Sequence, residues 1–374
     1  MRPRPRTPGQ PSELHDVRSA AWLGLALGVT FGTCFMTGLW SHLAQDPPSW
    51  FTYPARPAGL YRVTQGLHVA SGMAAIPLLL AKLWVVHPAL LEWPPARSVL
   101  HAVERLALVP LVGGGLFQVL SGTLNVAQWY PWSFFFPRAH LWVAWITIGA
   151  LIVHVGAKAA AARDAVRRQP RAAGVPRVAG VVQAADDRRA FLGGVAATSV
   201  GLVVATAGGT VSALSPVSVL AQRQPGVGPQ GVPVNKSAAA ARVTDLARDP
   251  AYRLVVEGAV DHRLELSLDD LRALPQREAR LPIACVEGWS ASARWRGVPV
   301  RDLLARAGAA ADAEATVESL QPTGRYRTAH LDTHQAADGD SLLAVDLDGE
   351  PLHIDHGFPV RLIGPNRPGV LQTK

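Results

Sequence analysis

Five long apolar runs constrain this chain more than any other feature of its sequence. Each has about the 20 residues that a helix needs to cross a bilayer. The runs are Ala20–Leu43, Leu60–Val86, Leu100–Thr123, Phe134–Ala157 and Phe191–Ala213. Tryptophans stand near the ends of several runs, as in the aromatic belts of membrane proteins. The sequence therefore predicts an all-α bundle of five transmembrane helices, and buried helices of a large soluble protein are the weaker alternative.

The distribution of positive charge predicts how these helices are oriented. The formal net charge is +8, but the arginines cluster beside apolar runs, as topology determinants do, which argues against nucleic acid as a partner. The loops at 44–59 and 124–133 together contain one basic residue, Arg56. Basic residues instead fill the N-terminus and the connection after the fourth run: Arg2, Arg4, Arg6, Arg18, Lys158, Arg163, Arg167, Arg168, Arg171, Arg177, Arg188 and Arg189. We expect a cytoplasmic N-terminus, five crossings of the cytoplasmic (inner) membrane, and everything beyond Ala213 on the extracytoplasmic side of the lipid bilayer.

An arginine pair precedes the fifth run, in the sequence Asp187-Arg188-Arg189-Ala190-Phe191-Leu192. Followed by Phe-Leu, the pair resembles an internal twin-arginine export signal, which moves folded domains across a membrane. A bare arginine pair also serves as an ordinary positive-inside anchor. Because Ser212-Ala213 is a poor cleavage site, we expect the segment to remain in place as a signal anchor.

His68, His140 and His154 lie well inside the apolar runs, where an ionisable side chain is costly and is a functional candidate. His68 and His140 occur at similar depths in helices that both run inward, which suits the two axial ligands of one b-type haem. His154 follows His140 by fourteen residues, nearly four turns, and so shares its helix face. This spacing resembles membrane cytochrome b proteins with two haems, but Lys82 stands where the second helix would carry the partner of His154. The alternative for each histidine is an imidazole packed against a neighbouring helix.

Composition changes along the chain and divides it into segments. Charged residues become frequent from about Asn235 onward, after a stretch rich in Pro, Gly and Gln. We expect a cytoplasmic N-terminus at 1–18, a four-helix membrane domain at 19–160, a basic cytoplasmic loop at 161–189, a fifth helix at 190–214, a linker at 215–233 and an outer domain at 234–374.

The outer domain alternates short strands with short helices. Strands are predicted at 252–257, 263–266, 280–286, 316–320, 326–331, 342–347 and 360–363, and helices at 268–273 and 300–307. Ser267 is a suitable N-cap for the first helix, and Gly308 a suitable residue to end the second. Because there is no regular βαβ alternation and no Gly-rich phosphate loop, we expect no Rossmann nucleotide site. The pattern predicts a strand-rich α+β domain.

Cys285 lies at the end of the apolar strand at 280–286 and is the only cysteine outside the membrane half. The other cysteine, Cys34, lies in an apolar run, so no disulfide framework is expected. Arg294 and Arg296 follow Cys285, and positive charge nearby favours a thiolate. No second cysteine or suitably spaced histidine pair is available for zinc. Since a single cysteine is more often a small buried residue than a ligand, Cys285 alone leaves both interpretations open.

The run Cys285-Val286-Glu287-Gly288-Trp289-Ser290, with Trp295-Arg-Gly-Val-Pro299 after it, resembles the molybdopterin domain of the sulfite oxidase family. The branch it resembles most contains the periplasmic methionine-sulfoxide reductase catalytic subunit. The resemblance covers about 234–374 and implies that Cys285 is the sole protein ligand of molybdenum, beside the dithiolene of molybdopterin. It also implies that Arg361 contacts the pterin phosphate, an anion that suits a planar, charged fork. The other pterin contacts that it implies are Asn235, Ser319, His356, Gln372, Thr373 and Lys374.

The chain departs from the family pattern in three places. His356 stands where the methionine-sulfoxide reductase branch often has Asn. The family continues past Lys374, so we expect this domain to be shortened at its C-terminus. The basic cluster that binds sulfite in sulfite oxidases has only Arg294 and Arg296 as candidates, and solvated arginines are the simpler interpretation of both.

These observations together predict a membrane-anchored molybdenum–molybdopterin oxidoreductase with its active site outside the cytoplasmic membrane. Its reaction would be oxygen-atom transfer to or from a small-molecule or protein substrate, with electrons exchanged through haem b and the quinone pool. One alternative is a non-catalytic anchored binding protein that keeps the fold. Another is the same enzyme on a haem-free anchor.

Overall fold

The computed structural model describes residues 15–93, 98–167 and 179–374. Some of the basic residues on which the predicted orientation rests lie outside these ranges: Arg2, Arg4, Arg6, Arg168, Arg171 and Arg177. The chain forms two compact units. We call residues 1–36 and 68–204 the helical unit, and residues 37–67 and 205–374 the sheet unit. The sheet unit therefore includes the end of the first long helix, the start of the second, and the loop that joins them.

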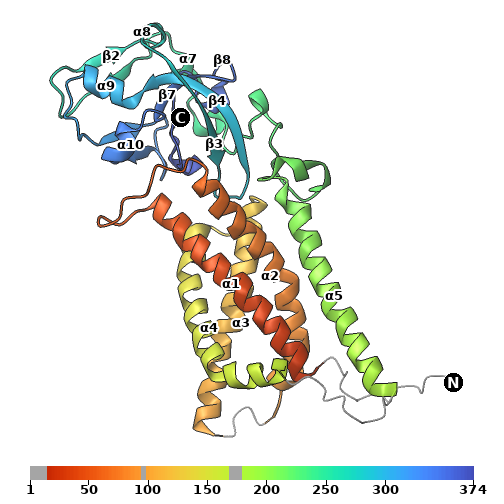
Figure 1. Ribbon diagram of the computed structural model, residues 1–374. Coiled ribbons are helices and arrows are strands. Elements are labelled where there is room, and N and C mark those ends of the chain that lie inside the picture. Colours follow the sequence, from red (N-terminus) through yellow and green to blue (C-terminus); the bar gives the residue numbers. More distant parts are fainter. Residues whose placement is uncertain (1–14, 94–97, 168–178) are drawn as a thin grey trace. The chain divides into compact units, whose positions relative to one another are not determined.

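Five long helices confirm the five apolar helices that the sequence predicts. All five are long and apolar enough to cross a membrane. They are α1 (Val17–Gln45), α2 (Leu60–Leu90), α3 (Val99–Val126), α4 (Phe136–Arg167) and α5 (Ala179–Ala207) (Figure 1).

The predicted limits of the fifth helix and of the basic loop are wrong. Helix α5 already includes Ala179 and ends at Ala207, whereas the prediction was Phe191–Ala213. The segment 161–189 was predicted as a loop, but its described parts belong to α4 and α5. Both parts are rich in alanine, the strongest helix former, so the helices continue past the end of the apolar pattern. Gly208 and Gly209 follow the last turn of α5, where glycine favours a helix end.

The helical unit has an apolar core and one close crossing of helices. Leu23 and Leu27 of α1 are buried against Leu78 and Leu79 of α2, and Phe191 of α5 packs against the same cluster. Helices α3 and α4 pack along each other (Figure 1). At their crossing Gly114 approaches the Thr147 hydroxyl so closely that a Cβ would clash with it. The small residue therefore allows the close spacing of the two helices.

The sheet unit contains a five-stranded antiparallel sheet and two small antiparallel ribbons. In the sheet, β3, β4, β7 and β8 lie in that order and β9 pairs with β7. The ribbons are β1–β2 and β5–β6. The strands are β1 (Leu254–Val256), β2 (Leu264–Leu266), β3 (Arg277–Ala284), β4 (Ser290–Pro299), β5 (Ala315–Glu318), β6 (Thr328–Leu331), β7 (Leu342–Leu347), β8 (Glu350–Pro351) and β9 (Arg361–Ile363).

Short helices accompany these strands, which confirms the α+β class of the unit. The α-helices are α6 (Ala238–Ala241), α7 (Thr244–Arg248), α8 (Leu268–Ala273), α9 (Val300–Arg306) and α10 (Thr333–Ala337). The 3-10 turns are η1 (Ser212–Val217), η2 (Pro229–Gly231), η3 (Ile354–His356) and η4 (Gly369–Leu371). Ser267 caps α8 in a capping box with Asp270, as its sequence position indicates.

Strand β4 is the main element that the sequence analysis did not predict. Its burial alternates regularly, with Ala291, Ala293 and Trp295 inward and Arg294 and Arg296 outward. That period of two is the ordinary signal of a half-buried strand. Helix α10 was also missed; Asp332 caps it by accepting a hydrogen bond from the Gln335 N–H.

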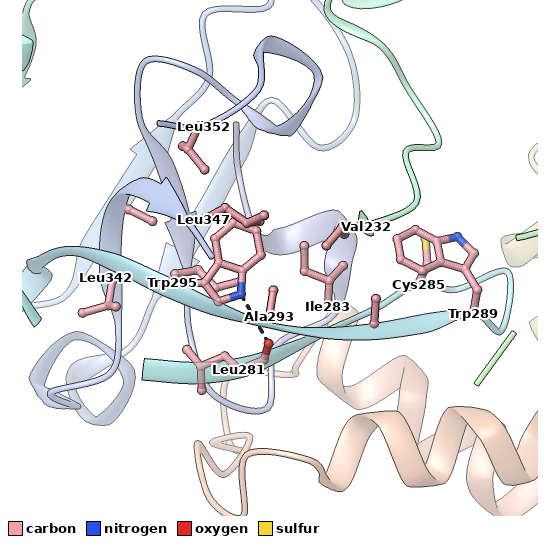
Figure 2. Packing of buried hydrophobic residues seen from close by; sticks show 13 residues of the cluster. Val232, Leu281, Ile283, Cys285, Trp289, Ala293, Trp295, Leu342, Leu347 and Leu352 are labelled. Carbon is pink, nitrogen blue, oxygen red and sulfur yellow. Dashed lines mark hydrogen bonds between the residues drawn. The ribbon is translucent and has the colours of Figure 1, made fainter. Parts of the chain in front are cut away.

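The core of the sheet unit lies against strands β3, β4 and β7. Figure 2 shows Trp295 at its centre, with Leu281, Leu342 and Leu347 around it. Trp295 is fully buried, and its indole N–H donates to the Leu281 carbonyl at 3.3 Å. Burying one such aliphatic side chain contributes about 1.5–3 kcal/mol. The core therefore fixes the β3–β4 hairpin, and the hairpin in turn presents Cys285 at its tip.

Candidate active site

Cys285 lies in the tight turn between β3 and β4, residues 285–289, which we call the cysteine loop. The Cys285 N–H donates to the Trp289 carbonyl at 2.9 Å, and the Gly288 N–H donates to the Cys285 carbonyl at 3.0 Å. Gly288 has φ of +90°, a left-handed conformation that suits glycine. Cys285 is buried and packs in the core cluster beside Trp289 (Figure 2). The hairpin thus holds the thiol at a fixed position rather than on a flexible loop.

Two polar groups, the Asn235 amide and the Glu287 carboxylate, contact the Cys285 sulfur, and the Trp289 indole contacts one of them. The Asn235 side-chain amide donates to Sγ at 2.8 Å and to the Glu287 carboxylate at 2.6 Å. The Trp289 indole N–H donates to Asn235 Oδ1 at 2.9 Å, which fixes the orientation of this amide. The thiol itself donates to Glu287. The structure therefore brings Asn235 to Cys285 across 50 residues of sequence, and it adds Glu287, which the sequence analysis did not assign to the site.

The environment of Cys285 favours the neutral thiol. Burial, the charge of Glu287 and the hydrogen bond to it raise the pKa of the Cys285 thiol well above its ordinary value. A bound cation reverses this preference, because a metal deprotonates a coordinating thiol outright. The site is thus poorly suited to a free nucleophilic thiolate, and a thiolate here needs a bound cation to stabilise it.

A second group of predicted residues surrounds Arg361, at the start of β9. Its guanidinium is buried, stacks over the Trp295 ring at 5.7 Å and donates to the His356 carbonyl at 3.1 Å. Burial lowers the pKa of Arg361 to about 10. Its Nε has no hydrogen-bond partner anywhere in the described part of the chain. A buried cation with an unused donor fits an anionic ligand, since such a group is otherwise costly.

Lys374 connects the region of Arg361 with the segment of Asn235. Its ammonium donates to the carbonyls of Lys236 at 2.8 Å and Asp355 at 2.5 Å. Burial and the charge of Arg361 lower the pKa of Lys374 to about 7. Ser319 Oγ donates to the Lys374 carbonyl at 2.6 Å. An anion bound here would favour the charged form of both basic side chains.

Several buried polar atoms near these residues lack partners, which further supports a polar ligand. Gln372 Oε1, Thr373 Oγ1 and Ser290 Oγ have no hydrogen-bond partner among residues 15–93, 98–167 and 179–374. Buried polar atoms are nearly always hydrogen-bonded in folded proteins. Gln372 and Thr373 were predicted contacts, and Ser290 was quoted only as part of the motif. Together with Arg361, these atoms fit a group rich in both donors and acceptors.

The two predicted candidates for a substrate-binding basic cluster make ion pairs elsewhere. Arg296 pairs with Asp346 at 2.8 Å, and Arg294 approaches Asp348 at 3.6 Å; both arginines are half exposed. They lie on the outward face of β4. The simpler interpretation, solvated arginines, therefore agrees with the structure.

The burial of His356 is expected to make the stability of the fold depend on pH. Its ring nitrogen Nε2 hydrogen-bonds the Pro229 carbonyl at 2.7 Å, and burial lowers the pKa of the imidazole to about 4. An unfolded histidine titrates near pH 6.5. Between these values the unfolded chain binds a proton that the folded chain does not, so the stabilisation is complete above pH 6.5 and is lost as the pH falls toward 4. The loss is about 2 kcal/mol by pH 5 and about 3 kcal/mol by pH 4.

We expect wild-type protein to lose more thermal stability than His356→Gln when both are taken from pH 7 to pH 5. Scanning fluorimetry of the detergent-purified full chain measures this difference. The control is His353→Gln, because His353 is exposed. Identical pH profiles for wild type and His356→Gln would contradict the assignment.

A separate pair of histidines meets in the helical unit. The rings of His68 (α2) and His140 (α4) have centroids 6.1 Å apart and planes at 75°. His68 Nδ1 hydrogen-bonds the Cys34 carbonyl at 2.9 Å, and His140 Nδ1 hydrogen-bonds Ser121 Oγ at 2.9 Å. Bonds at Nδ1 orient the rings and make Nε2 the nitrogen for a metal bond. The structure thus brings together two histidines that are 72 positions apart.

His154 is not part of this pair. It lies in α4, partly buried, and no second imidazole contacts its ring among the residues that the structure describes. Lys82, which stands at the corresponding position of α2, donates to the Ala20 carbonyl at 2.5 Å. Of the three predicted haem ligands, therefore, two face each other and the third stands apart.

Comparison with known proteins identifies the C-terminal part of the chain. Residues 240–374 match the family described as oxidoreductase molybdopterin binding domain. A putative protein-methionine-sulfoxide reductase subunit of Azospira oryzae is 35% identical over 33% of this chain and 46% of its own length. Mitochondrial sulfite oxidase of Mus musculus is 36% identical over 34% of this chain and 28% of its own.

A third relative, the protein-methionine-sulfoxide reductase catalytic subunit of Xanthomonas campestris pv. campestris, is 33% identical over 33% of this chain and 42% of its own length. The chain spans less than half the length of each of these three relatives. Residues 240–374, which contain Cys285 and Arg361, are therefore similar to the oxidoreductase molybdopterin-binding domain found in sulfite oxidases and methionine-sulfoxide reductases.

Proposed function

We propose that this protein is a membrane-anchored molybdenum–molybdopterin oxidoreductase that acts outside the cytoplasmic membrane. Its reaction is oxygen-atom transfer, and its electrons are exchanged through a membrane haem b with the quinone pool. The observation that carries this proposal is the buried Cys285 thiol, held in a rigid hairpin turn within a molybdopterin-binding domain. Molybdenum with its dithiolene supplies the two-electron oxygen-atom chemistry when bound.

The residues near Cys285 and Arg361 divide the work of holding such a cofactor. Cys285 supplies the soft thiolate that molybdenum favours. Asn235, which donates to the sulfur at 2.8 Å, stabilises negative charge there. Arg361 and Lys374 supply buried positive charge for the pterin phosphate. The remaining proposed pterin contacts are Ser319, His356, Gln372 and Thr373.

The proposal of a haem rests on the facing pair His68 and His140. Two imidazoles that bind one iron through nitrogens at about 2 Å have centroids about 6 Å apart. The observed separation is 6.1 Å. Their hydrogen bonds to Cys34 and Ser121 are the outer contacts that such ligands usually make. We propose one haem at this pair and assign no second haem to His154.

The orientation across a membrane is also a proposal. It is supported by the five apolar helices and by the scarcity of basic residues in the two loops that would face outward. The pair Arg188-Arg189 lies within α5, where Arg188 forms an ion pair with Asp16 at 3.1 Å. We propose that this pair acts as a twin-arginine signal anchor, because a domain that acquires its cofactor in the cytoplasm must be exported folded.

The substrate is proposed only as a class. Relatives named sulfite oxidase and methionine-sulfoxide reductase act in opposite directions on sulfur. We therefore propose either a small-molecule or a protein donor or acceptor of an oxygen atom at sulfur or nitrogen, and assign no direction. Arg294 and Arg296 are not proposed as substrate ligands, because they are paired with carboxylates.

Two measurements on one detergent-purified sample of the full chain test this proposal. Elemental analysis is expected to find molybdenum, and a reduced-minus-oxidised spectrum is expected to show the bands of haem b. Protein without molybdenum, expressed in cells that make the cofactor, would support the non-catalytic binding protein instead. Molybdenum without haem bands would support the same enzyme on a haem-free anchor.

A further inference from the structure

The outer end of helix α2 reaches the cysteine loop through Gln65. Its side-chain amide donates to the Val286 carbonyl at 2.9 Å, next to Cys285 in the sequence. Ser41 Oγ donates to Gln65 Oε1 at 3.0 Å, so the amide is held from both sides. Gln65 is buried, and these residues all belong to the sheet unit. A helix of the apolar part of the chain thus bonds directly to the turn that carries the metal-ligand cysteine.

Tyr61 supports the same turn one helical turn earlier. It is buried and packs in a cluster with Ala284, on the other side of Cys285 in the sequence. Its N–H donates to Asn366 Oδ1 at 2.6 Å. Residues four apart lie on one face of a helix, so Tyr61 and Gln65 present a single face of α2 to the two residues that flank the cysteine.

A second segment holds the cysteine loop from the end of α5. The Ser290 N–H donates to the Gly209 carbonyl at 2.8 Å, and Thr210 Oγ1 donates to the Gly288 carbonyl. The two supporting segments also meet each other, since a Cβ added at Gly66 would lie 3.0 Å from Thr210 Cγ2. The carbonyls of Val286 and Gly288 and the N–H of Ser290 therefore have their hydrogen-bond partners in Gln65, Thr210 and Gly209.

We infer that Gln65 is a positioning residue of the molybdenum centre, and that α2 and the residues after α5 together fix the geometry of the cysteine loop. This inference rests on the proposed function for its molybdenum. A metal ligand works only when outer contacts hold it in orientation. A buried carbonyl such as that of Val286 is costly to leave without a partner. The apolar helix is thus a working part of the site as well as an anchor.

The test compares Gln65→Leu with wild type in the full chain. Leucine has a similar size but cannot donate to the Val286 carbonyl. The control is Gln45→Leu at the end of α1, where the glutamine amide also donates to a backbone carbonyl, that of Ser41, at 3.2 Å. Hydrogen exchange of the peptide spanning 281–299 measures the rigidity of the loop, and electron paramagnetic resonance of Mo(V) measures the metal geometry.

We expect Gln65→Leu to speed amide exchange in the cysteine loop roughly threefold to tenfold, the loss of one hydrogen bond, and to shift the Mo(V) g-values at unchanged molybdenum content. Gln45→Leu is expected to change neither. Unaltered exchange in Gln65→Leu would overturn the inference with or without metal. Unaltered g-values in Gln65→Leu that contains molybdenum would overturn the positioning role of Gln65. Faster exchange in a protein that never contains molybdenum would instead overturn the proposed function and leave the support of the loop by α2 standing.

Discussion

Cys285→Ser is expected to lower turnover by at least about a thousandfold, the scale of losing a group that the chemistry cannot do without. Serine has nearly the same size, but its hydroxyl is a poor ligand for a metal that favours soft sulfur. Cys285 is buried in the core cluster of the hairpin, and the isosteric replacement leaves that packing intact. Molybdenum content by elemental analysis and turnover with a sulfoxide or sulfite as probe substrates measure the effect.

The matched control is Cys34→Ser, at the other cysteine of the chain. Cys34 lies in α1, where its thiol donates to the His68 carbonyl. We expect Cys34→Ser to keep the molybdenum content of wild type. Full molybdenum content and full activity in Cys285→Ser would refute the assignment of Cys285 as the metal ligand.

His68→Leu and His140→Leu are each expected to abolish the haem b bands of the purified protein. A haem held by two histidines loses its low-spin spectrum when either one is replaced. The ring centroids are 6.1 Å apart, and each ring supplies one of the two proposed iron ligands. Replacing either histidine therefore leaves the pair with a single ligand. The reduced-minus-oxidised spectrum, normalised to protein and to molybdenum content, measures the loss.

His154→Leu is the matched control for both variants. His154 lies on α4, as His140 does, but its ring has no imidazole partner in the described ranges. We expect it to keep the wild-type spectrum. Loss of half of the haem in His154→Leu would show a second haem, and retention of all haem in His140→Leu would show that the iron is bound elsewhere.

The apolar helices could be predicted from sequence because their signal is local. Twenty consecutive apolar residues meet one requirement, the thickness of a bilayer. The meeting of His68 and His140 was predicted from their similar depth, which is also a local quantity once the helices are known. The limits of α5 were wrong because the helix continues through polar residues such as Asp186 and Arg189, where hydropathy carries no signal.

The surroundings of Cys285 could be predicted only in part. The predicted roles of Asn235 and Arg361 came from a resemblance, and the structure places Asn235 against the sulfur. Gln65 was missed, since its hydrogen bond to Val286 joins residues 221 positions apart. No local pattern indicates such a contact. A glutamine near the start of an apolar run is the one hint that the sequence offers.

The loop between α1 and α2 has a consequence for how the protein is made. Asn366 donates to the carbonyls of Pro54 at 2.5 Å and Ala58 at 3.0 Å, and Arg56 pairs with Asp338 at 2.9 Å. The sheet unit is therefore assembled from two stretches separated by more than a hundred residues of helix. Synthesis delivers the loop early and residues 205–374 last. In the proposed topology, the contacts between these two stretches form only after export, once both lie on the same side of the membrane. If the proposed topology holds, completion of the sheet unit therefore depends on insertion of the first helical hairpin in the proposed orientation.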